Sequence, residues 1–408
     1  MAPRLTGRYT SSVAGGQPVE AFIPAPLPPR DPALALAGKL TKRLHEAEQA
    51  LARLELAGEL VPSIDWLLYA FVRKEAVLSS QIEGTQASLI DLFNYEAADG
   101  VAPSADVEEV CNYLEALAYA RQQLASPKGL PVSVRLLAEA HRRLMRGVRG
   151  GDKAPGKIRR VQNWVGGRRP EDAVFVPPPP QEVTALLGEL ERYIHAGDDL
   201  PLLLRAGLVH VQFETIHPFL DGNGRVGRLL IGLLLERWGL LQQPLLYLSL
   251  FFKRHRAEYY RRLNAVRTDG DWEGWLAYFL DGVATTAGET VTAARDLFTL
   301  VAADRSKVLA LETTSLASLR LFELLPKHPV VTAGTVQRLL RTTKPTAGRA
   351  VDGLVEAGVL VETTGKRRDR AWSYRAYLDR LRDGTDLDAS TGPAAPARLA
   401  KPRRTTRS

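Results

Sequence analysis

The sequence predicts a mainly α-helical protein with one small β-hairpin in its middle and a winged helix-turn-helix unit near its carboxyl end. Apolar residues recur at steps of three and four over long stretches, which is the period of an amphipathic helix. Residues 156–180 break that pattern, because two short apolar runs flank the turn at 166–170, which is a hairpin signal. Residues 303–380 show helical segments followed by two strands joined by a basic turn, the pattern of a winged helix.

The length and composition are those of an ordinary globular chain. The 408 residues predict two or three domains, and the apolar content of 45% is enough for a packed core. The single cysteine, Cys111, excludes an intrachain disulfide. No apolar run is long enough for a secretory signal or a membrane span, so we expect a cytoplasmic protein without a membrane partner. The net charge of +8 favours nucleic acid, a nucleotide or an acidic partner.

The amino-terminal part of the chain is predicted to be an extended arm followed by helices. Residues 1 to about 30 are rich in Gly and Pro, so we expect them to lie on the surface or on a neighbouring domain. Helical periodicity runs over 32–94 and includes a helix at 63–79, which continues or restarts at 79–84. Further helices are predicted over 107–124, 132–144, 181–196, 202–215 and 225–238.

A loop and helix start at residues 217–228, His-Pro-Phe-Leu-Asp-Gly-Asn-Gly-Arg-Val-Gly-Arg, combine several groups suited to phosphate chemistry. His217 can accept a proton near neutral pH. The glycines permit close approach to the backbone, and the unpaired amides at the start of the next helix form an anion site. Asp221 is a hard oxygen ligand suited to Mg²⁺, and Arg225 and Arg228 can bind phosphate. The alternative for this loop is an ordinary turn or helix cap.

The same twelve residues match every specified position of HPFxDGNGRxxR, and they therefore resemble the signature of the Fic family. The resemblance implies a Fic fold, which is a helical core with a small β-hairpin flap. It also implies transfer of AMP from ATP to a Ser, Thr or Tyr hydroxyl of a protein, the chain itself included. His217 would deprotonate that hydroxyl, and Asp221 would hold Mg²⁺ at the α- and β-phosphates. Asn223 and the glycine amides would steady the α-phosphate, Arg225 the outer phosphates and Arg228 the γ-phosphate.

The resemblance implies two further parts of the site. The hairpin at 156–180 would be the flap, which would bind the target backbone by β-augmentation. Tyr259-Tyr260 resembles a family pair that borders the nucleotide base, with core packing as the alternative. The residues predicted to bind ATP are Phe219, Asp221, Gly222, Asn223, Gly224, Arg225, Gly227, Arg228 and Tyr260.

A second motif, at residues 79–84, resembles the inhibitory sequence (S/T)xxxE(G/N) of the family. Taken alone, the pattern indicates only a serine and a glutamate one turn apart on a helix. Beside a complete Fic loop it implies that Glu83 pairs with Arg228, since a partly buried charge-assisted pair is strong. ATP would then bind in a non-productive pose and the enzyme would be largely self-inhibited. The predicted regulatory residues are Ser79, Glu83 and Gly84.

The resemblance covers about residues 5–380 and predicts four segments. Residues 1–104 would be the arm and the Fic amino-terminal helical region with the inhibitory helix. Residues 105–300 would be the catalytic core, and residues 301–382 the winged helix. Residues 383–408 would be a basic disordered tail.

The partner of the winged helix stays open at this point. Residues 345–357 would be the recognition helix, with Arg341, Lys344 and Arg349 on DNA phosphates and the turn at 366–370 in a groove. A protein-interaction or homodimer module with a solvated basic face is the alternative. For the whole protein we predict a self-inhibited AMP transferase that uses ATP and Mg²⁺. A DNA-binding regulator whose Fic domain senses nucleotide, and an enzyme that removes AMP, are the alternatives.

Overall fold

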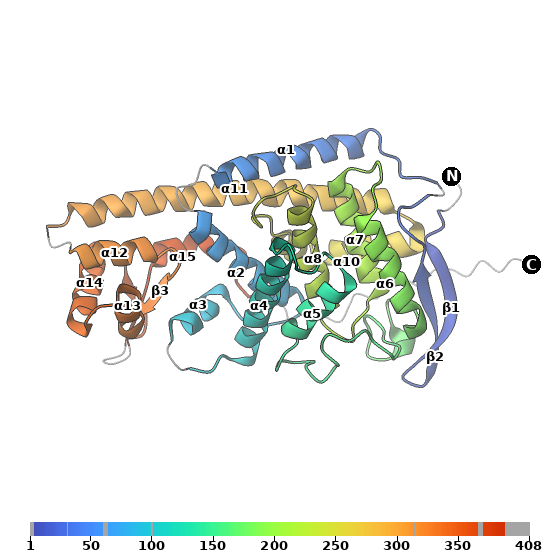
Figure 1. The fold of residues 1–408 in the computed structure, drawn as a ribbon, viewed down its shortest axis with the longest axis horizontal. Coiled ribbons are helices and arrows are strands. Elements are labelled where there is room, and N and C mark those ends of the chain that lie inside the picture. Colours follow the sequence, from blue (N-terminus) through green and yellow to red (C-terminus); the bar gives the residue numbers. More distant parts are fainter. Residues whose placement is uncertain are drawn as a thin grey trace, which may run out of the picture.

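The computed structural model describes residues 4–30, 32–59, 64–98, 101–312, 315–365 and 370–387. In this part of the chain, helices form most of the molecule and two small sheets lie near its two ends (Figure 1). The helices are α1 (Lys39–Glu59), α2 (Ile64–Ile82), α3 (Leu89–Ala97), α4 (Ala105–Ala125), α5 (Val134–Leu144), α6 (Pro180–His195), α7 (Leu202–Ile216), α8 (Asn223–Arg237), α9 (Ser249–Arg254), α10 (Arg256–Asp269), α11 (Trp272–Ala310), α12 (Leu316–Leu324), α13 (Ala333–Leu340), α14 (Lys344–Glu356) and α15 (Arg375–Leu381).

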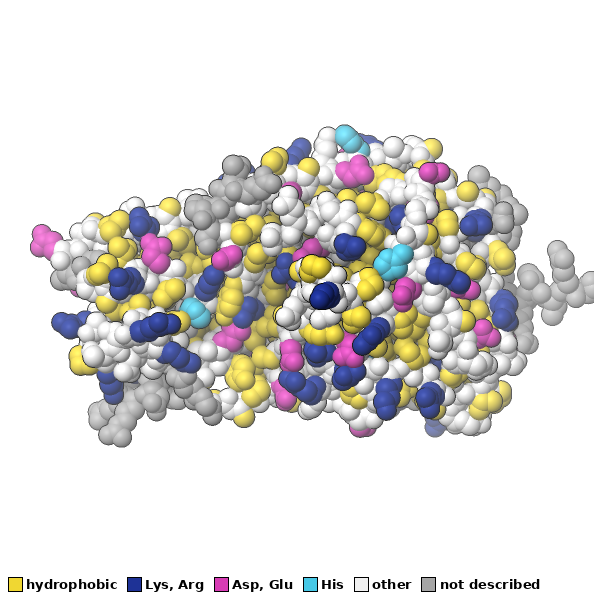
Figure 2. Space-filling model, viewed as in Figure 1, with side chains coloured by type: hydrophobic (Ala, Val, Ile, Leu, Met, Phe, Trp, Pro, Cys, Tyr) yellow, Lys and Arg dark blue, Asp and Glu magenta, His cyan; other side chains and the backbone are white. Residues whose placement is uncertain are grey.

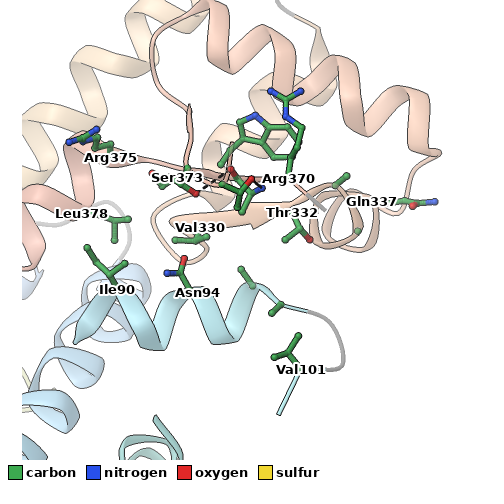
Figure 3. Close-up of a pocket in the computed structure, with 18 of the residues that line it drawn as sticks. Ile90, Asn94, Val101, Val330, Thr332, Gln337, Arg370, Ser373, Arg375 and Leu378 are labelled. Carbon is green, nitrogen blue, oxygen red and sulfur yellow. Dashed lines mark hydrogen bonds between the residues drawn. The ribbon is translucent and has the colours of Figure 1, made fainter. Parts of the chain in front are cut away.

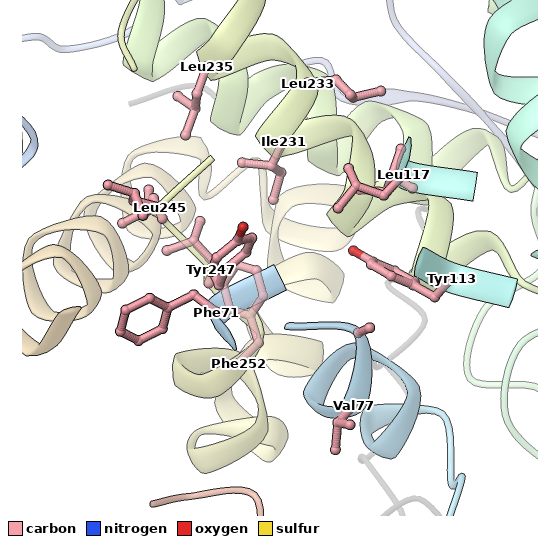
Figure 4. Close-up of a cluster of buried hydrophobic side chains, with 14 of the residues drawn as sticks. Phe71, Val77, Tyr113, Leu117, Ile231, Leu233, Leu235, Leu245, Tyr247 and Phe252 are labelled. Carbon is pink, nitrogen blue, oxygen red and sulfur yellow. The ribbon is translucent and has the colours of Figure 1, made fainter. Parts of the chain in front are cut away.

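The centre of the core is α7, whose residues 203–216 are all buried. A helix that is buried on every side must be covered by neighbours, and α6, α8 and α11 pack against it. Figure 4 shows how side chains from distant segments meet beside α8, with Phe71 from α2, Tyr113 and Leu117 from α4 and Ile231 from α8. Burial of each such side chain contributes about 1.5–3 kcal/mol to folding. This packing fixes the positions of α2 and α8 relative to each other. Both helices contribute residues to the site described below.

The predicted amino-terminal arm is a β-hairpin. Strand β1 (Gly7–Ala14) pairs antiparallel with β2 (Gln17–Pro24), with Gly7 opposite Pro24 and Ala14 opposite Gln17. The turn at Gly15-Gly16 has φ values of 54° and 80°, which favour glycine and suit a two-residue hairpin turn. The Gly- and Pro-rich composition concealed this hairpin, because only β2 buries an apolar face while β1 is largely polar.

The hairpin predicted at 156–180 is wrong in detail, because its ladder is reduced to a single bridge between Val165 and Phe175. A 3-10 turn at Pro170–Asp172 fills the connection. Prolines from 177 to 180 have no N–H to donate, so the ladder cannot be extended in that direction. The amino-terminal hairpin supports this flap instead, since the amide of Phe22 donates to the carbonyl of Val176 at 3.0 Å.

Helix α11 has 39 residues and is therefore about 58 Å long. It lies along α1 and connects the core to a carboxyl-terminal unit (Figure 1). This unit contains α12, α13 and α14 and a sheet of strand order β3-β5-β4, formed by β3 (Val330–Thr332), β4 (Val361–Glu362) and β5 (Ala371–Ser373). The element order agrees with the predicted helices and hairpin. The tip of the predicted wing at 366–369 and most of the tail predicted at 383–408, residues 388–408, lie outside the described residues. Residues 383–387 of that predicted tail are instead placed against α2 and α9.

The surface carries both signs of charge. Figure 2 shows Lys and Arg side chains spread over the helices of the core and over the carboxyl-terminal unit, with Asp and Glu side chains between them. Among the described residues, none of the helices has the length and hydropathy needed to cross a bilayer.

Candidate active site

The predicted loop lies between the end of α7 and the start of α8. His217 adopts a left-handed conformation, with φ 49° and ψ 61°, which ends α7. Gly222 has φ 75° and caps α8 without a side chain, so the first amides of α8 stay open to an anion. Asn223 closes the loop, because its Oδ1 accepts from the amide of Phe219 at 2.9 Å and its Nδ2 donates to the carbonyl of Phe219 at 2.8 Å. The side chain of Asn223 is thus used within the loop itself.

The imidazole of His217 is half-buried and lies near the positive charge of Arg159. Burial, with the Arg159 guanidinium as a second cause, lowers the pKa of His217 to about 4. Arg159 also donates from Nε to the carbonyl of His217 at 2.9 Å, which fixes the backbone there. The backbone carbonyl of Glu214 favours the protonated ring and opposes this shift of the pKa. A carbonyl only accepts, so a ring nitrogen that faces it would carry the proton and leave the other nitrogen as the acceptor.

Asp221 forms an ion pair with a lysine that the sequence patterns did not single out. Lys153 Nζ lies 2.9 Å from Asp221 Oδ2, and the amide of Gly222 donates to Asp221 Oδ1 at 2.7 Å. Burial alone would raise the pKa of Asp221, but Lys153 outweighs it and the pKa is lowered. The carboxylate is therefore ionised, as an Mg²⁺ ligand must be. No group of three or more acidic, His or Cys side chains that could hold a metal occurs in the described part of the chain, so the other ligands would have to come from nucleotide phosphates and water.

The end of α2 reaches the start of α8 and contacts Arg228 at three points. Arg228 donates from Nη2 to Glu83 Oε1 at 2.7 Å and to the carbonyl of Ser79 at 2.8 Å, and from Nε to Ser79 Oγ at 2.9 Å. The Arg228 side chain is 2% exposed. Burial alone would raise the pKa of Glu83, but the charge of Arg228 outweighs it and the pKa is lowered. The pair is therefore ionised, and the three acceptors lie on the last turn of α2 and on the residue that follows it.

The carboxylate of Glu83 also lies against the first turn of α8, beside Gly224. A Cβ placed on Gly224 would lie 2.2 Å from Glu83 Oε1 and 2.9 Å from Arg228 Nη1. Only a glycine permits this approach. The partial positive charge at a helix start favours a nearby anion, and the side chain of Glu83 lies beside this turn. Gly84 follows with φ 98° and ends the turn.

Two predicted ATP-binding residues point into the protein. Arg225 is 3% exposed, and its Nη1 lies 3.4 Å from Glu109 Oε2. Its Nε has no hydrogen-bond partner among the described residues. Phe219 is 1% exposed and stacks on His141 with a centroid distance of 3.8 Å. Both side chains therefore pack inside the protein beneath the loop and stabilise its position.

The aromatic pair after the loop divides between core and surface. Tyr259 is 1% exposed and hydrogen-bonds to His210 Nε2 at 2.9 Å, whereas Tyr260 is 40% exposed. His210 Nδ1 lies 3.0 Å from the carbonyl of Gly227, so Nδ1 carries the proton and Tyr259 donates to Nε2. Tyr260 lies near the Glu83 and Arg228 charges, which both affect its pKa, although burial is the larger cause of its upward shift. Tyr260 is the member of the pair placed to contact a ligand.

Sequence reasoning missed His141, which stands under the loop. Its Nδ1 accepts from the amide of Gly156 at 2.8 Å, so its Nε2 carries the proton and donates to the carbonyl of Asp221 at 2.9 Å. Burial lowers the pKa of His141 to about 4, so the ring stays neutral. The residues around it come from segments far apart in the chain, and no local pattern connects them. Only the folded structure shows that His141 supports the loop. It likewise shows that Lys153, Arg159 and Glu109 contact residues of the loop.

Comparison with known proteins shows which family the residues of this site resemble. Residues 41–122 match a model described as Fic/DOC family N-terminal, and residues 131–235 match the Fic/DOC family itself. Protein adenylyltransferase Fic of Drosophila grimshawi is 31% identical over 173 residues, which are 41% of this chain and 32% of the relative. The protein of the same name from Culex quinquefasciatus is 28% identical over 253 residues, which are 58% of this chain and 46% of the relative.

The matched regions thus span about a third to a half of the length of these curated relatives. A crystal structure of a Fic family protein from Desulfovibrio desulfuricans G20 superposes with a TM-score of 0.54 and 18% identity, over 83% of this chain and 97% of that one. This likeness concerns the fold. Both family models fall on the helices that form the site, and the second contains the whole loop at 217–228. The chain therefore contains a Fic/DOC N-terminal region at residues 41–122 and a Fic/DOC domain at residues 131–235.

Proposed function

We propose that this chain is a protein adenylyltransferase that acts in the cytoplasm on a Ser, Thr or Tyr hydroxyl, uses Mg-ATP as its donor, and is held inactive by Glu83. One observation carries the proposal: a complete Fic loop with a neutral His217 stands beside an Arg228 that donates hydrogen bonds to Ser79 and Glu83. The adenylyltransferase name of the relatives supports the type of reaction.

The residues of the loop would divide the reaction between them. The target hydroxyl oxygen would attack the α-phosphorus of ATP, the bond from that phosphorus to the bridging oxygen would break, and pyrophosphate would leave. The hydroxyl proton would pass to the free nitrogen of His217. Asp221 would hold Mg²⁺, which neutralises phosphate charge, after Lys153 moves from its carboxylate. The open amides at the start of α8 would hold phosphate oxygens.

The inhibition follows from the contacts of Arg228. A γ-phosphate needs the same guanidinium and the same helix start that Glu83 lies against. Two anions cannot share that place without strong repulsion. While Glu83 is in position, ATP would therefore have to bind with its terminal phosphates elsewhere, and the α-phosphorus would not align with the target oxygen.

The direct test uses the full chain with α-labelled ATP and Mg²⁺. Glu83→Gly should raise label transfer by about a hundredfold or more, since a misaligned substrate loses about that factor. Glu83→Gly combined with His217→Ala is the matched control, and it should lose the gain because the base is absent. Mass spectrometry should find AMP on protein hydroxyls. If neither this chain nor any protein of a lysate incubated with Glu83→Gly carries an AMP adduct, the proposal is wrong.

A nucleic-acid-binding role for the carboxyl-terminal unit is a second candidate. A cleft lies between α3 and the sheet, and it is bordered by Arg370, Arg375 and Arg382 (Figure 3). Arg349 on α14 is also exposed, as a phosphate contact requires. The charges are partly neutralised, because Arg370 Nη2 lies 3.7 Å from a carboxylate oxygen of Glu362. Duplex binding by the full chain that weakens steeply with salt would support this role, and binding without salt dependence would contradict it.

A further inference from the structure

The chain returns to the inhibitory helix after its last helix ends. Residues 383–387, which we name the strap, follow α15 and lie against the end of α2 and against α9. The carbonyl of Thr385 accepts from Gln81 Nε2 at 2.9 Å, although 304 positions separate the two residues. Thr385 is 1% exposed. The strap is thus anchored by a buried Thr385, while Asp383, Asp386 and Leu387 remain exposed.

Gln81 connects the strap to the inhibitory motif. It lies on the last turn of α2, between Ser79 and Glu83, and is 9% exposed. Its Nε2 donates to the carbonyls of Ala87 and Thr385, both at 2.9 Å. Both amide hydrogens are therefore used, and the strap supplies one of the two acceptors. Without the strap, the buried Nε2 of Gln81 would lose one of its acceptors. Separation of Gln81 from the strap is therefore unfavourable.

Lys253 of α9 hydrogen-bonds both to Gln81 and to the strap. Its Nζ donates to Gln81 Oε1 at 2.8 Å, to the carbonyl of Gly384 at 3.3 Å and to the carbonyl of Asp386 at 2.8 Å. One ammonium group therefore bridges the inhibitory helix and the strap. Because the group is charged, each of these bonds is stronger than a bond between neutral groups.

The strap also fits its place closely. Gly384 has φ 76°, and a Cβ on it would lie 2.5 Å from Leu250 Cδ1. Asp383 pairs with Arg254, with 3.5 Å between Oδ2 and Nη2. The positive φ of Gly384 favours glycine, and the backbone of the strap passes close to the Leu250 side chain of α9.

We propose that the strap is a second restraint on the inhibitory helix, and that it couples the carboxyl-terminal unit to the active site. While the strap is seated, it holds Gln81 and thereby the turn from which Ser79 and Glu83 reach Arg228. When the strap leaves, that turn loosens and Glu83 withdraws from Arg228 more often. Helix α15, which carries the strap, also borders the cleft of Figure 3. A ligand in that cleft would therefore touch the helix that holds the strap in place.

The contact between strap and α2 stands by itself, but its regulatory consequence rests on the proposed adenylyltransferase activity. Gly384→Val in the full chain should expel the strap, because the side chain meets Leu250 and strains the backbone. Amide hydrogen exchange over residues 76–84 should then be about tenfold faster, the size expected when the net free energy of one or two hydrogen bonds is lost. AMP transfer should rise by about tenfold, and it should stay below that of Glu83→Gly.

Gly365→Val is the matched control. Gly365 also has a positive φ, of 62°, but a Cβ there meets no atom of the described residues within 4 Å. Its exchange over 76–84 and its AMP transfer should equal those of the wild type. Lys253→Met is the second test variant, since it removes the bridge without strain in the strap, and it should change both readouts in the same direction as Gly384→Val.

The readouts separate the two proposals. Unchanged exchange over 76–84 in both Gly384→Val and Lys253→Met overturns the strap proposal, whatever the activity. Faster exchange with no AMP transfer even in Glu83→Gly supports the restraint and refutes the proposed function. Faster exchange with active Glu83→Gly, but with Gly384→Val no more active than wild type, overturns the coupling to the active site.

Discussion

The ammonium of Lys153 lies 2.9 Å from Asp221 Oδ2, so a lysine occupies the oxygen that the proposed reaction assigns to Mg²⁺. Both side chains are partly exposed, at 48% and 35%. An ion pair of this kind is worth about 0.2–1 kcal/mol. The metal therefore has a competitor inside the protein that is weak enough to be displaced.

The first prediction concerns this competition. Lys153→Met should lower the Mg²⁺ concentration needed for half-maximal AMP transfer by about two- to fivefold, because the metal no longer displaces a cation. The measurement is an Mg²⁺ titration of AMP transfer in the Glu83→Gly background. Lys157→Met removes an exposed charge from the same loop without an ion pair to Asp221, and it should leave the titration unchanged. An identical Mg²⁺ dependence in the two lysine variants would show that Lys153 does not compete.

The second prediction concerns pH. A base works when it is neutral, and His217 is neutral above its lowered pKa of about 4. In the Glu83→Gly background the rate of AMP transfer should therefore stay level as the pH falls from about 8 to about 6, and decline only as the pH approaches 4. An ordinary histidine would lose half of its activity near pH 6.5. A midpoint there would show that the environment of His217 described above does not control its protonation.

The third prediction concerns Ser79 and its neighbour. Ser79→Ala removes the Oγ that accepts from Arg228 Nε, and a hydrogen bond to a charged group is worth about 1.5–3 kcal/mol. AMP transfer should rise by about tenfold or more, to a level between wild type and Glu83→Gly. Ser80→Ala is the control, because Ser80 Oγ is buried and has no hydrogen-bond partner among the described residues. Equal rates in the two alanine variants would exclude a role of the Ser79 hydroxyl in restraining Arg228.

The fourth prediction concerns stability. Burial raises the pKa of Glu75 to about 7 from 4.5, although Ser249 and Arg228 oppose the shift. The folded state then binds more protons than the unfolded state between these pH values, so stability is lost as the pH rises from 4.5 to 7. The loss from this one group is on the order of 3 kcal/mol. Glu75→Gln cannot ionise, and its stability should decline less over that interval.

Urea unfolding of both proteins across this pH range measures the difference. The buried His141, His210 and His217 act in the opposite direction, since their pKa values are lowered and acid therefore destabilises the fold. These histidines are present in both proteins, so subtraction isolates Glu75. Parallel stability curves for wild type and Glu75→Gln would mean that Glu75 does not titrate between pH 4.5 and 7.

The parts of the structure that the sequence could predict are those encoded by neighbouring residues. The helical period of residues 63–79 leads into α2, and the loop at 217–228 stands between two helices as its proline and glycines require. The proximity of Glu83 and Arg228 was implied by the resemblance of the two motifs to those of the Fic family. The residues of the motif at 79–84, taken alone, indicated only a serine and a glutamate one turn apart on a helix.

The parts that were missed depend on long-range contacts without a local pattern. Lys153 is one of several cations in an irregular loop, and its partner Asp221 is 68 positions away. Gln81 stands in the inhibitory motif at a position that the motif leaves free, and its partner Thr385 lies near the other end of the chain. The hairpin at residues 7–24 was missed because only one of its strands buries apolar side chains.

Helix α11 has a mechanical consequence. A continuous helix of 39 residues joins the core to the carboxyl-terminal unit, so the two are linked by a stiff rod. Over a length of about 58 Å, a tilt of about 5° at one end displaces the other end by about 5 Å. Helix α1 lies along the rod and resists such a tilt. The strap connects the carboxyl-terminal unit back to α2, so this unit is attached to the core both through α11 and through the strap. A displacement of the unit along one connection therefore exerts a force on the other.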